Sequence, residues 1–312
     1  MHREIARMQP YNSGWENFAS WSVSPSKLAR RGEEVLNHLE RRGIRIPPGN
    51  RVQRAIEITD QLNSTEALAK ATPDQLSTAS EAFRTLWEVF FICYTKIERP
   101  RQSEAISNEG LAALLRGADT PIGESKSTPR DTQFELLTAA MFILGGADVK
   151  PGEPDLRFLY HGRYVGIAAK RVRSLQTATL RDALRDAARQ IQGATKVGFV
   201  AMNLDTRLQE LDTSGASTVG ASFNAQVHDA HQQLFDISEK EAILGGLLFG
   251  TFFGWNLERA IPRMEFYMPF QIQSFTMTDE DVRRTREFFE PWRARLAASI
   301  AEVIPLVSRP AA

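Results

Sequence analysis

The chain has 312 residues, of which 42% are hydrophobic, so it can build a substantial core and is expected to form two domains rather than one. Basic and acidic residues are equal in number, 38 each, so the overall charge neither indicates nor excludes a nucleic-acid partner. Cys93 is the single cysteine, which excludes an internal disulfide and favours a reducing compartment. The N-terminus has no apolar signal region, and the longest uncharged apolar run, residues 242–255, is too short to span a bilayer. We therefore expect a cytoplasmic protein without a membrane partner.

Residues 1–125 are predicted to form an all-helical N-terminal domain. Segment 26–44 has apolar residues near helical spacing and ends at Gly43, and segment 73–100 lies between two prolines. The second of these helices carries a group of large side chains that we assign to the core rather than to a cofactor site: Phe83, Leu86, Trp87, Phe90 and Phe91. The boundary is placed in residues 117–131, which are rich in Gly, Pro, Ser and Thr without periodicity. The sequence does not distinguish among partner recognition, sensing and oligomerisation as the role of this domain.

Residues 126–312 have a mixed α and β pattern and are predicted to form the second domain. An apolar helix ends at Gly145-Gly146, and a further helix runs from residue 179 to about residue 193. Strands are expected in five segments: 154–160, 163–171, 196–204, 243–255 and 264–275. Residues 205–222 are expected to form a mobile loop, and the C-terminal region a pair of helices broken at Pro291. The fold class is therefore α/β, or α+β, with a mixed sheet flanked by helices.

The first two of these strands are predicted to form a hairpin, because His161-Gly162 between them suits a two-residue turn. With such a turn, the numbers of paired residues add up to 323, so position 155 lies opposite position 168. One face of the hairpin then carries only apolar side chains, and the other carries Asp155, Arg157, Tyr164, Ala168 and Lys170. This alternation is typical of a half-buried antiparallel pair.

Asp155 and the side chain at position 168 should be about 5 Å apart on the polar face. Lys170 points the same way, roughly 6–7 Å further along the strand. An acid at position 168 would place two carboxylates opposite each other, which becomes favourable when a divalent cation such as Mg²⁺ lies between them. The chain has Ala168 at that position, and two alanines in the middle of a strand are unusual because alanine is a poor strand former.

The order of Glu135 on a helix, Pro154-Asp155, and Ala168-Ala169-Lys170 resembles the PD-(D/E)XK nucleases, the restriction-endonuclease-like superfamily. The usual form of the motif reads GIEAKR or GIECKR where this chain reads GIAAKR. The resemblance covers roughly residues 132–204 and extends to the order of helix, hairpin, helix and strand. It implies a restriction-endonuclease-like core for the second domain.

The resemblance also implies roles for individual residues. Asp155 would be a metal ligand, Glu135 would ligate the metal or hold a metal-bound water, and Lys170 would position or deprotonate the attacking water. Gln190, on the following helix, would support the site. The expected cofactor is Mg²⁺ or Mn²⁺, which lowers the pKa of a bound water and stabilises the charged phosphate. Ala168 takes the place of the second ligand and cannot coordinate a metal.

The alanine has two interpretations. It is either an engineered inactivating substitution or the mark of a natural degenerate member that binds nucleic acid without cutting it. We favour the first, because Asp155, Lys170 and Glu135 are all retained. Under both interpretations the chain should cut poorly or not at all.

The segment from residue 156 to residue 189 has eight basic residues and two acidic ones, which makes it a candidate surface for the nucleic-acid backbone. Besides Lys170, the candidate nucleic-acid contacts are all arginines: Arg171, Arg173, Arg181, Arg185 and Arg189. The last three repeat every four residues and are expected to form one stripe on a helix. The alternative is a solvated face with local Asp182–Arg185 and Asp186–Arg189 pairs.

The spacing of His228 and His231 suggests zinc, but no third ligand accompanies them, and a helix surface is the better interpretation.

The leading hypothesis for the function is a metal-dependent nuclease acting on DNA, with RNA as an alternative substrate and bacterial anti-phage defence as a role that the resemblance implies. The second hypothesis is a non-catalytic nucleic-acid-binding or scaffold protein with the same fold, and the third is a protein-binding module. Restriction-type cutting would also imply a homodimer, and the helical domain is the candidate site for oligomerisation or for a protein partner.

Overall fold

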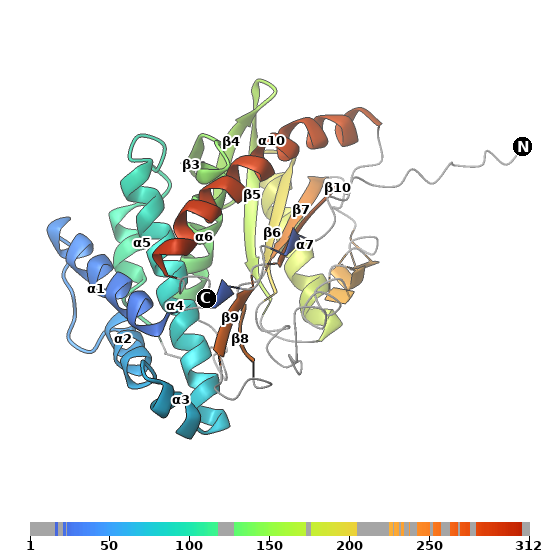
Figure 1. The fold of residues 1–312 in the computed structure, drawn as a ribbon. Helices are drawn as coiled ribbons and strands as arrows, with labels where there is room; N and C mark the ends of the chain where they lie inside the picture. Colours follow the sequence, from blue (N-terminus) through green and yellow to red (C-terminus); the bar gives the residue numbers. More distant parts are fainter. Residues whose placement is uncertain are drawn as a thin grey trace, which may run out of the picture.

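The computed structural model of the chain describes the backbone of residues 16–17, 21–22, 24–117, 128–172, 176–204, 225–226, 228–230, 232–233, 237, 242–249, 252–256, 263–267, 269–274 and 279–307. The predicted loop over residues 205–222 lies outside this set. Within it, helices pack against a central mixed sheet, so the structure belongs to the α+β class (Figure 1). No helix in the described part of the chain is both long and apolar enough to cross a membrane.

Among its described residues, the N-terminal region contains five helices: α1 (Pro25–Arg41), α2 (Arg51–Gln61), α3 (Thr65–Lys70), α4 (Pro73–Glu98) and α5 (Asn108–Ala113). The start of α4 is stabilised by a capping box, in which Thr72 and Gln75 satisfy each other's backbone N–H groups. The five large side chains predicted for the core on this helix are all buried. The two helices predicted in segments 26–44 and 73–100 are present as α1 and α4, and each has a side-chain cap at its start and buried apolar residues.

In the part of the chain that the structure describes, seven strands form the main sheet in the order β1-β10-β7-β6-β5-β4-β3. Their bounds are β1 (Glu16–Asn17), β3 (Val149–Pro151), β4 (Leu156–Tyr160), β5 (Arg163–Arg171), β6 (Gly198–Asn203), β7 (Ile243–Phe249) and β10 (Pro269–Ser274). Strands β5, β6 and β7 are parallel to one another, and the strands on either side of them pair antiparallel. A second sheet consists of β2 (Trp21–Ser22), β9 (Arg263–Tyr267) and β8 (Phe252–Asn256).

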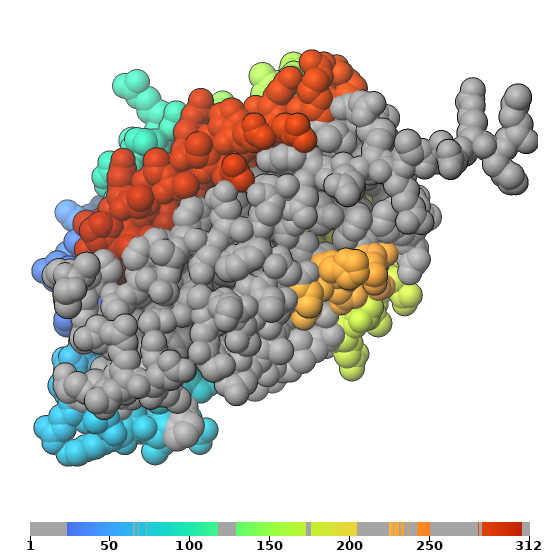
Figure 2. Space-filling view, turned by 45° about the vertical axis from the view of Figure 1, so that its right-hand side comes forward, coloured from blue at the N-terminus to red at the C-terminus, as the bar shows by residue number. Residues whose placement is uncertain are grey.

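Helices cover both faces of the main sheet. The helices α6 (Thr128–Leu144) and α10 (Asp279–Val303) pack on one face, and α7 (Thr177–Ala194) packs on the other (Figure 1). Figure 2 shows the outer side of α10, in red, lying exposed across the molecule. A short 3₁₀ helix, η2 (Ile304–Leu306), follows α10. The apolar core is therefore divided into two layers by the sheet.

The N-terminal region differs from the prediction in two ways. It contributes strands β1 and β2, which pair with β10 and β9 respectively, so it is not all-helical. One hydrophobic cluster also extends from α1, α2 and α4 through α6 to the sheet and α10. In addition, buried Arg51 donates a hydrogen bond to Gln133 of α6, which donates to Glu88 of α4. The two regions of the chain therefore share one core around α6.

Two predictions for the C-terminal region are wrong. The segments 243–255 and 264–275 each contain two strands, and in each case the two strands belong to different sheets. The helix pair expected around Pro291 is one continuous helix, α10, with the proline inside it. Phe289, Trp292, Leu296 and Ile300 of α10 are buried along one side, and their packing compensates for the roughly 3 kcal/mol that an internal proline costs.

The contact between α10 and α6 depends on a residue without a side chain. A Cβ atom added to Gly145 would lie 2.1 Å from Cδ1 of Trp292, which is nearly fully buried. The indole also packs against Phe142, with ring centroids 5.3 Å apart. Because a rigid indole occupies this space, α10 can approach α6 only when position 145 is glycine.

We predict that Gly145→Ala lowers the free energy of unfolding by about 1–3 kcal/mol, because the new methyl group displaces Trp292 from a packed core. Gly193→Ala is the matched control, since a Cβ atom at this position on α7 meets nothing within 4 Å. The control should be neutral or stabilising by up to about 1 kcal/mol. Urea denaturation of both variants measures the difference, and equal midpoints would contradict the packing described for Trp292.

Candidate active site

The hairpin formed by β4 and β5 has the predicted register. Leu156 pairs with Ile167 and Tyr160 with Arg163, and each pair adds up to 323. The turn residues His161 and Gly162 have φ values of 46° and 76°, as a type I′ turn requires. Asp155 directly precedes Leu156, and Ala168 directly follows its partner Ile167, so the two residues adjoin the last observed pair of the hairpin.

Asp155 is fixed at the start of β4 by a hydrogen bond across the hairpin. Its Oδ2 atom accepts from the backbone N–H of Ala169 at 2.7 Å. Burial raises the pKa of the Asp155 carboxyl, while Lys170 and the Ala169 N–H group act in the opposite direction. The carboxylate is thus held next to the strand that carries Lys170.

Ala168 lies in a different environment from the predicted one. The alternation expected for a half-buried pair holds in β4, but residues 165–168 of β5 are all buried. Ala168 is completely buried, in the apolar cluster that also contains Leu180 and Leu184 of α7. This difference follows from topology, because β5 is an inner strand with a parallel neighbour and has helices on both faces.

Lys170 and Gln190 are brought together by α7. The Nζ atom of Lys170 donates a hydrogen bond to Oε1 of Gln190 at 2.5 Å. Twenty residues separate these side chains in the chain, and the helix returns along the sheet to join them. The structure therefore places Gln190 beside Lys170, where the resemblance expects a supporting residue.

Glu135 comes from α6, on the other side of the sheet from α7. Burial raises the pKa of the Glu135 carboxyl to about 7, with further increases from the negative charges of Asp155 and Asp131, while Lys170 lowers it. Glu135 is therefore electrostatically coupled to both Asp155 and Lys170. A carboxyl with such a perturbed pKa, beside a second acid and a cation, is typical of a functional site.

Asp131 lies at the site but was not among the predicted site residues. It lies one helical turn before Glu135, and its Oδ1 atom is 3.6 Å from Nη1 of Arg171. The i, i+4 spacing of two acids on one helix was the available signal. Asp131 adds negative charge near Glu135 and contacts the cation at the end of β5.

The oxygen ligands at this site suit a hard cation but are few. Asp155 and Glu135 offer two carboxylates, and Mg²⁺ accepts one or two protein carboxylates and fills its remaining positions with water and substrate oxygens. Among the described residues, no group of three or more His, Cys, Asp or Glu side chains is arranged to hold a metal ion. Ala168 adds only a methyl group where a third carboxylate would complete the set.

The candidate nucleic-acid contacts do not form one surface. The Arg171 side chain is only 9% exposed and is paired with Asp131, on the face of β5 opposite Lys170. Arg173 lies outside the described residues. On α7, Arg181 is half-buried, Arg189 is exposed, and Arg185 pairs with Asp182 at 3.0 Å. Arg171 is therefore part of the packing between β5 and α6 rather than of the α7 stripe.

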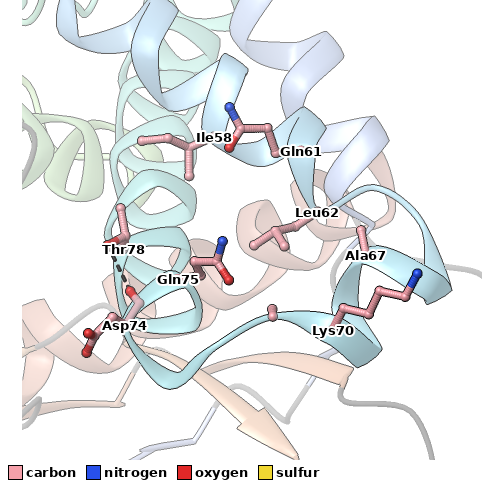
Figure 3. Close-up of a pocket in the computed structure, with 9 residues that line it drawn as sticks. Ile58, Gln61, Leu62, Ala67, Lys70, Asp74, Gln75 and Thr78 are labelled. Carbon is pink, nitrogen blue, oxygen red and sulfur yellow. Dashed lines mark hydrogen bonds between the residues drawn. The ribbon is translucent and has the colours of Figure 1, made fainter.

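Two other features of the described residues resemble binding sites in outline. His228 is exposed on a helical segment, as predicted, and contacts Gln232, while His231 lies outside the described residues. A pocket of about 370 Å³ lies among α2, α3 and α4 (Figure 3). Its polar side chains serve local helix structure, since Lys70 pairs with Glu66 and Gln75 caps α4. Neither feature assembles catalytic groups.

We predict that Glu135→Gln changes how stability depends on pH. A carboxyl with a folded-state pKa near 7 and an ordinary value of 4.5 binds more protons in the folded than in the unfolded state between these values. The free energy of unfolding of the unmodified chain should therefore fall, relative to that of the variant, as the pH rises through this window. Urea denaturation at several pH values, with exposed Glu40→Gln as the control, measures the slopes. Equal slopes for the unmodified chain and Glu135→Gln would show that Glu135 titrates normally.

No protein-family model, curated protein or solved structure matches this chain. The residues with the most chemical content are Asp155 directly before β4, Glu135 on α6, Lys170 on β5 and Gln190 on α7. We call these four residues the site quartet.

Proposed function

We propose that the chain has the scaffold of a metal-dependent nuclease of the PD-(D/E)XK type, acting on phosphodiester bonds, with DNA as the first substrate to test. The observation that carries this proposal is the Lys170–Gln190 hydrogen bond beside the cross-strand anchored Asp155. A restriction-endonuclease-like core and a role in anti-phage defence are parts of the same proposal. The mixed sheet with helices on both faces is compatible with such a core.

Each member of the site quartet has a chemical task in this proposal. Mg²⁺ or Mn²⁺ would supply an activated water and neutralise charge on the phosphate when bound. Asp155 and Glu135 would hold the cation, which would favour the ionised form of Glu135. Lys170, oriented by Gln190, would place its ammonium beside the attacked phosphate or accept a proton from the water.

Ala168 limits the activity of the chain as written. Its methyl group offers no oxygen to a cation, so metal affinity has to come from Asp155 and Glu135 alone. We therefore propose that cleavage is impaired or absent in this form. Metal-dependent activity should return when a carboxylate is supplied at position 168.

A second candidate function is a non-catalytic nucleic-acid-binding protein with the same fold. The observation that favours it is the complete burial of Ala168 within the apolar cluster under α7. A small residue fits that cluster, whereas a glutamate has to extend its carboxylate to the edge near Asp155. This alternative requires binding but no cleavage in any variant.

We predict that Ala168→Glu produces Mg²⁺- or Mn²⁺-dependent cleavage, because it completes a set of three carboxylates. The assay compares supercoiled, linear and single-stranded DNA and RNA, with each metal and with EDTA. A second substitution, Lys170→Ala, should abolish the restored cleavage. A metal concentration of about 100 times Kd should also stabilise the glutamate variant by about 2.7 kcal/mol, measured as a rise in Tm.

Ala168→Gln is the matched control, because it has the same bulk as glutamate but no charge. It should be folded in the presence of metal and show neither cleavage nor the metal-dependent rise in Tm. A folded Ala168→Glu protein that neither cleaves nor gains stability from metal would favour the non-catalytic alternative.

A further inference from the structure

The part of the hairpin nearest its turn has exposed apolar side chains. Within the described residues, three large hydrophobic side chains are exposed: Ile97, Leu159 and Tyr164, at 50%, 60% and 52%. Leu159 and Tyr164 are direct cross-strand partners, so two of the three form a single surface. The turn end of β4 and β5 extends at the top of Figure 1. Exposed apolar residues that lie together indicate a contact surface more strongly than scattered ones do.

This surface is on the same face of the hairpin as the candidate site. Alternate residues of β5 share a face, so Tyr164 points to the same side as Ala168 and Lys170. Four residues of strand separate Tyr164 from Ala168, or roughly 13 Å. Gly166 lies between them and is covered by Pro154 and Thr195, which a Cβ atom at that position would meet at 2.5 Å. The exposed part of this face therefore ends at Gly166, and Ala168 beyond it is buried.

The charged side chains of the hairpin itself, residues 156–167, are all basic. The guanidinium of Arg157 lies over the ring of Tyr164, with Cζ 5.1 Å from the ring centroid. Arg163 is exposed at the turn, and Lys196 is exposed in the loop that pairs with Gly166 through Val197. The hairpin from residue 156 to residue 167 contains no acidic residue. We call Arg157, Leu159 and Tyr164 the hairpin platform.

We propose that the hairpin platform stacks an unpaired base of a single-stranded nucleic acid, on the same hairpin that carries Asp155 and Lys170 of the site quartet. This inference rests on the proposed function and specifies its substrate as single-stranded. An exposed aromatic ring next to an apolar side chain binds the flat face of a base, and nearby cations contact the backbone phosphates. The bases of a duplex are already stacked on each other, so a duplex offers this platform only its phosphates.

The test is equilibrium binding of fluorescein-labelled oligonucleotides, followed by anisotropy at low salt in EDTA, so that no cleavage is required. Single-stranded DNA, single-stranded RNA and duplex DNA of equal length are compared. We expect tighter binding of a single strand than of the duplex. Tyr164→Ala should weaken single-strand binding by about 5- to 100-fold, whereas duplex binding should change by less than about 2-fold.

Two controls separate stacking from other effects. Tyr164→Phe retains the ring and should bind single strands nearly as tightly as the unmodified chain. Ile97→Ala removes the third exposed hydrophobic side chain, at the end of α4, and should leave binding unchanged. Because Tyr164 is more than half exposed, Tyr164→Ala should also keep the urea midpoint of the parent chain.

The outcomes distinguish this inference from the nuclease proposal. Single-strand binding that depends on the Tyr164 ring supports the platform, and it does so even when Ala168→Glu fails to cleave. Cleavage by Ala168→Glu together with unchanged single-strand binding by Tyr164→Ala overturns the platform alone. Binding of no nucleic acid, or equal losses for single-stranded and duplex ligands, also overturns it, and the first of these would favour a protein as the partner.

Discussion

The structure around the candidate site depends on the register between β4 and β5. Side chains alternate between the two faces of a strand, so a shift of one residue would exchange the buried and site-facing sets of this hairpin. The type I′ turn at His161-Gly162 permits one pairing, and that pairing brings Asp155 to the Ala169 N–H group. The burial of Phe158 and Val165 against α6 and α10 selects the same pairing. Turn geometry and core packing are therefore consistent with each other.

The helix α7 connects this local register to the rest of the sheet. It is the crossover between the parallel strands β5 and β6, and it covers the sheet face that contains Ala168. Its buried side includes Leu184 and Ile191, and its partly exposed side includes Gln190. The same amphipathic helix thus covers one apolar layer and carries Gln190, whose side-chain amide accepts the hydrogen bond from Lys170. Sheet topology, rather than sequence proximity, joins these two residues.

Local patterns were sufficient to predict much of this arrangement. The sequence of turn residues and alternating apolar residues predicted β5 with its observed bounds, the hairpin register and the position of α7 within two residues. Long-range contacts were not predictable in this way. The pairing of β1 and β2 with distant strands, the continuation of α10 through Pro291 and the burial of Ala168 all depend on packing partners that lie far away in sequence. Arg171 was assigned to a nucleic-acid surface from the basic residues around it in the sequence. Its ion-pair partner Asp131 lies on the preceding helix, α6, so the pairing could not be read from the local sequence.

Lys170 and Arg171 are adjacent at the end of β5, but their side chains contact different kinds of partner on opposite faces of the sheet. Lys170 contacts the amide of Gln190 on α7, and Arg171 pairs with the carboxylate of Asp131 on α6. Deletion of one residue from β5 before this pair would move Arg171 to the place of Lys170 and Val172 to the place of Arg171, while Lys170 would move to the opposite face of the strand. An arginine would then face the amide, and a valine would face the carboxylate. The primary amine would be lost from the site, so the length of β5 encodes the chemistry of this edge as strictly as the identity of its residues does.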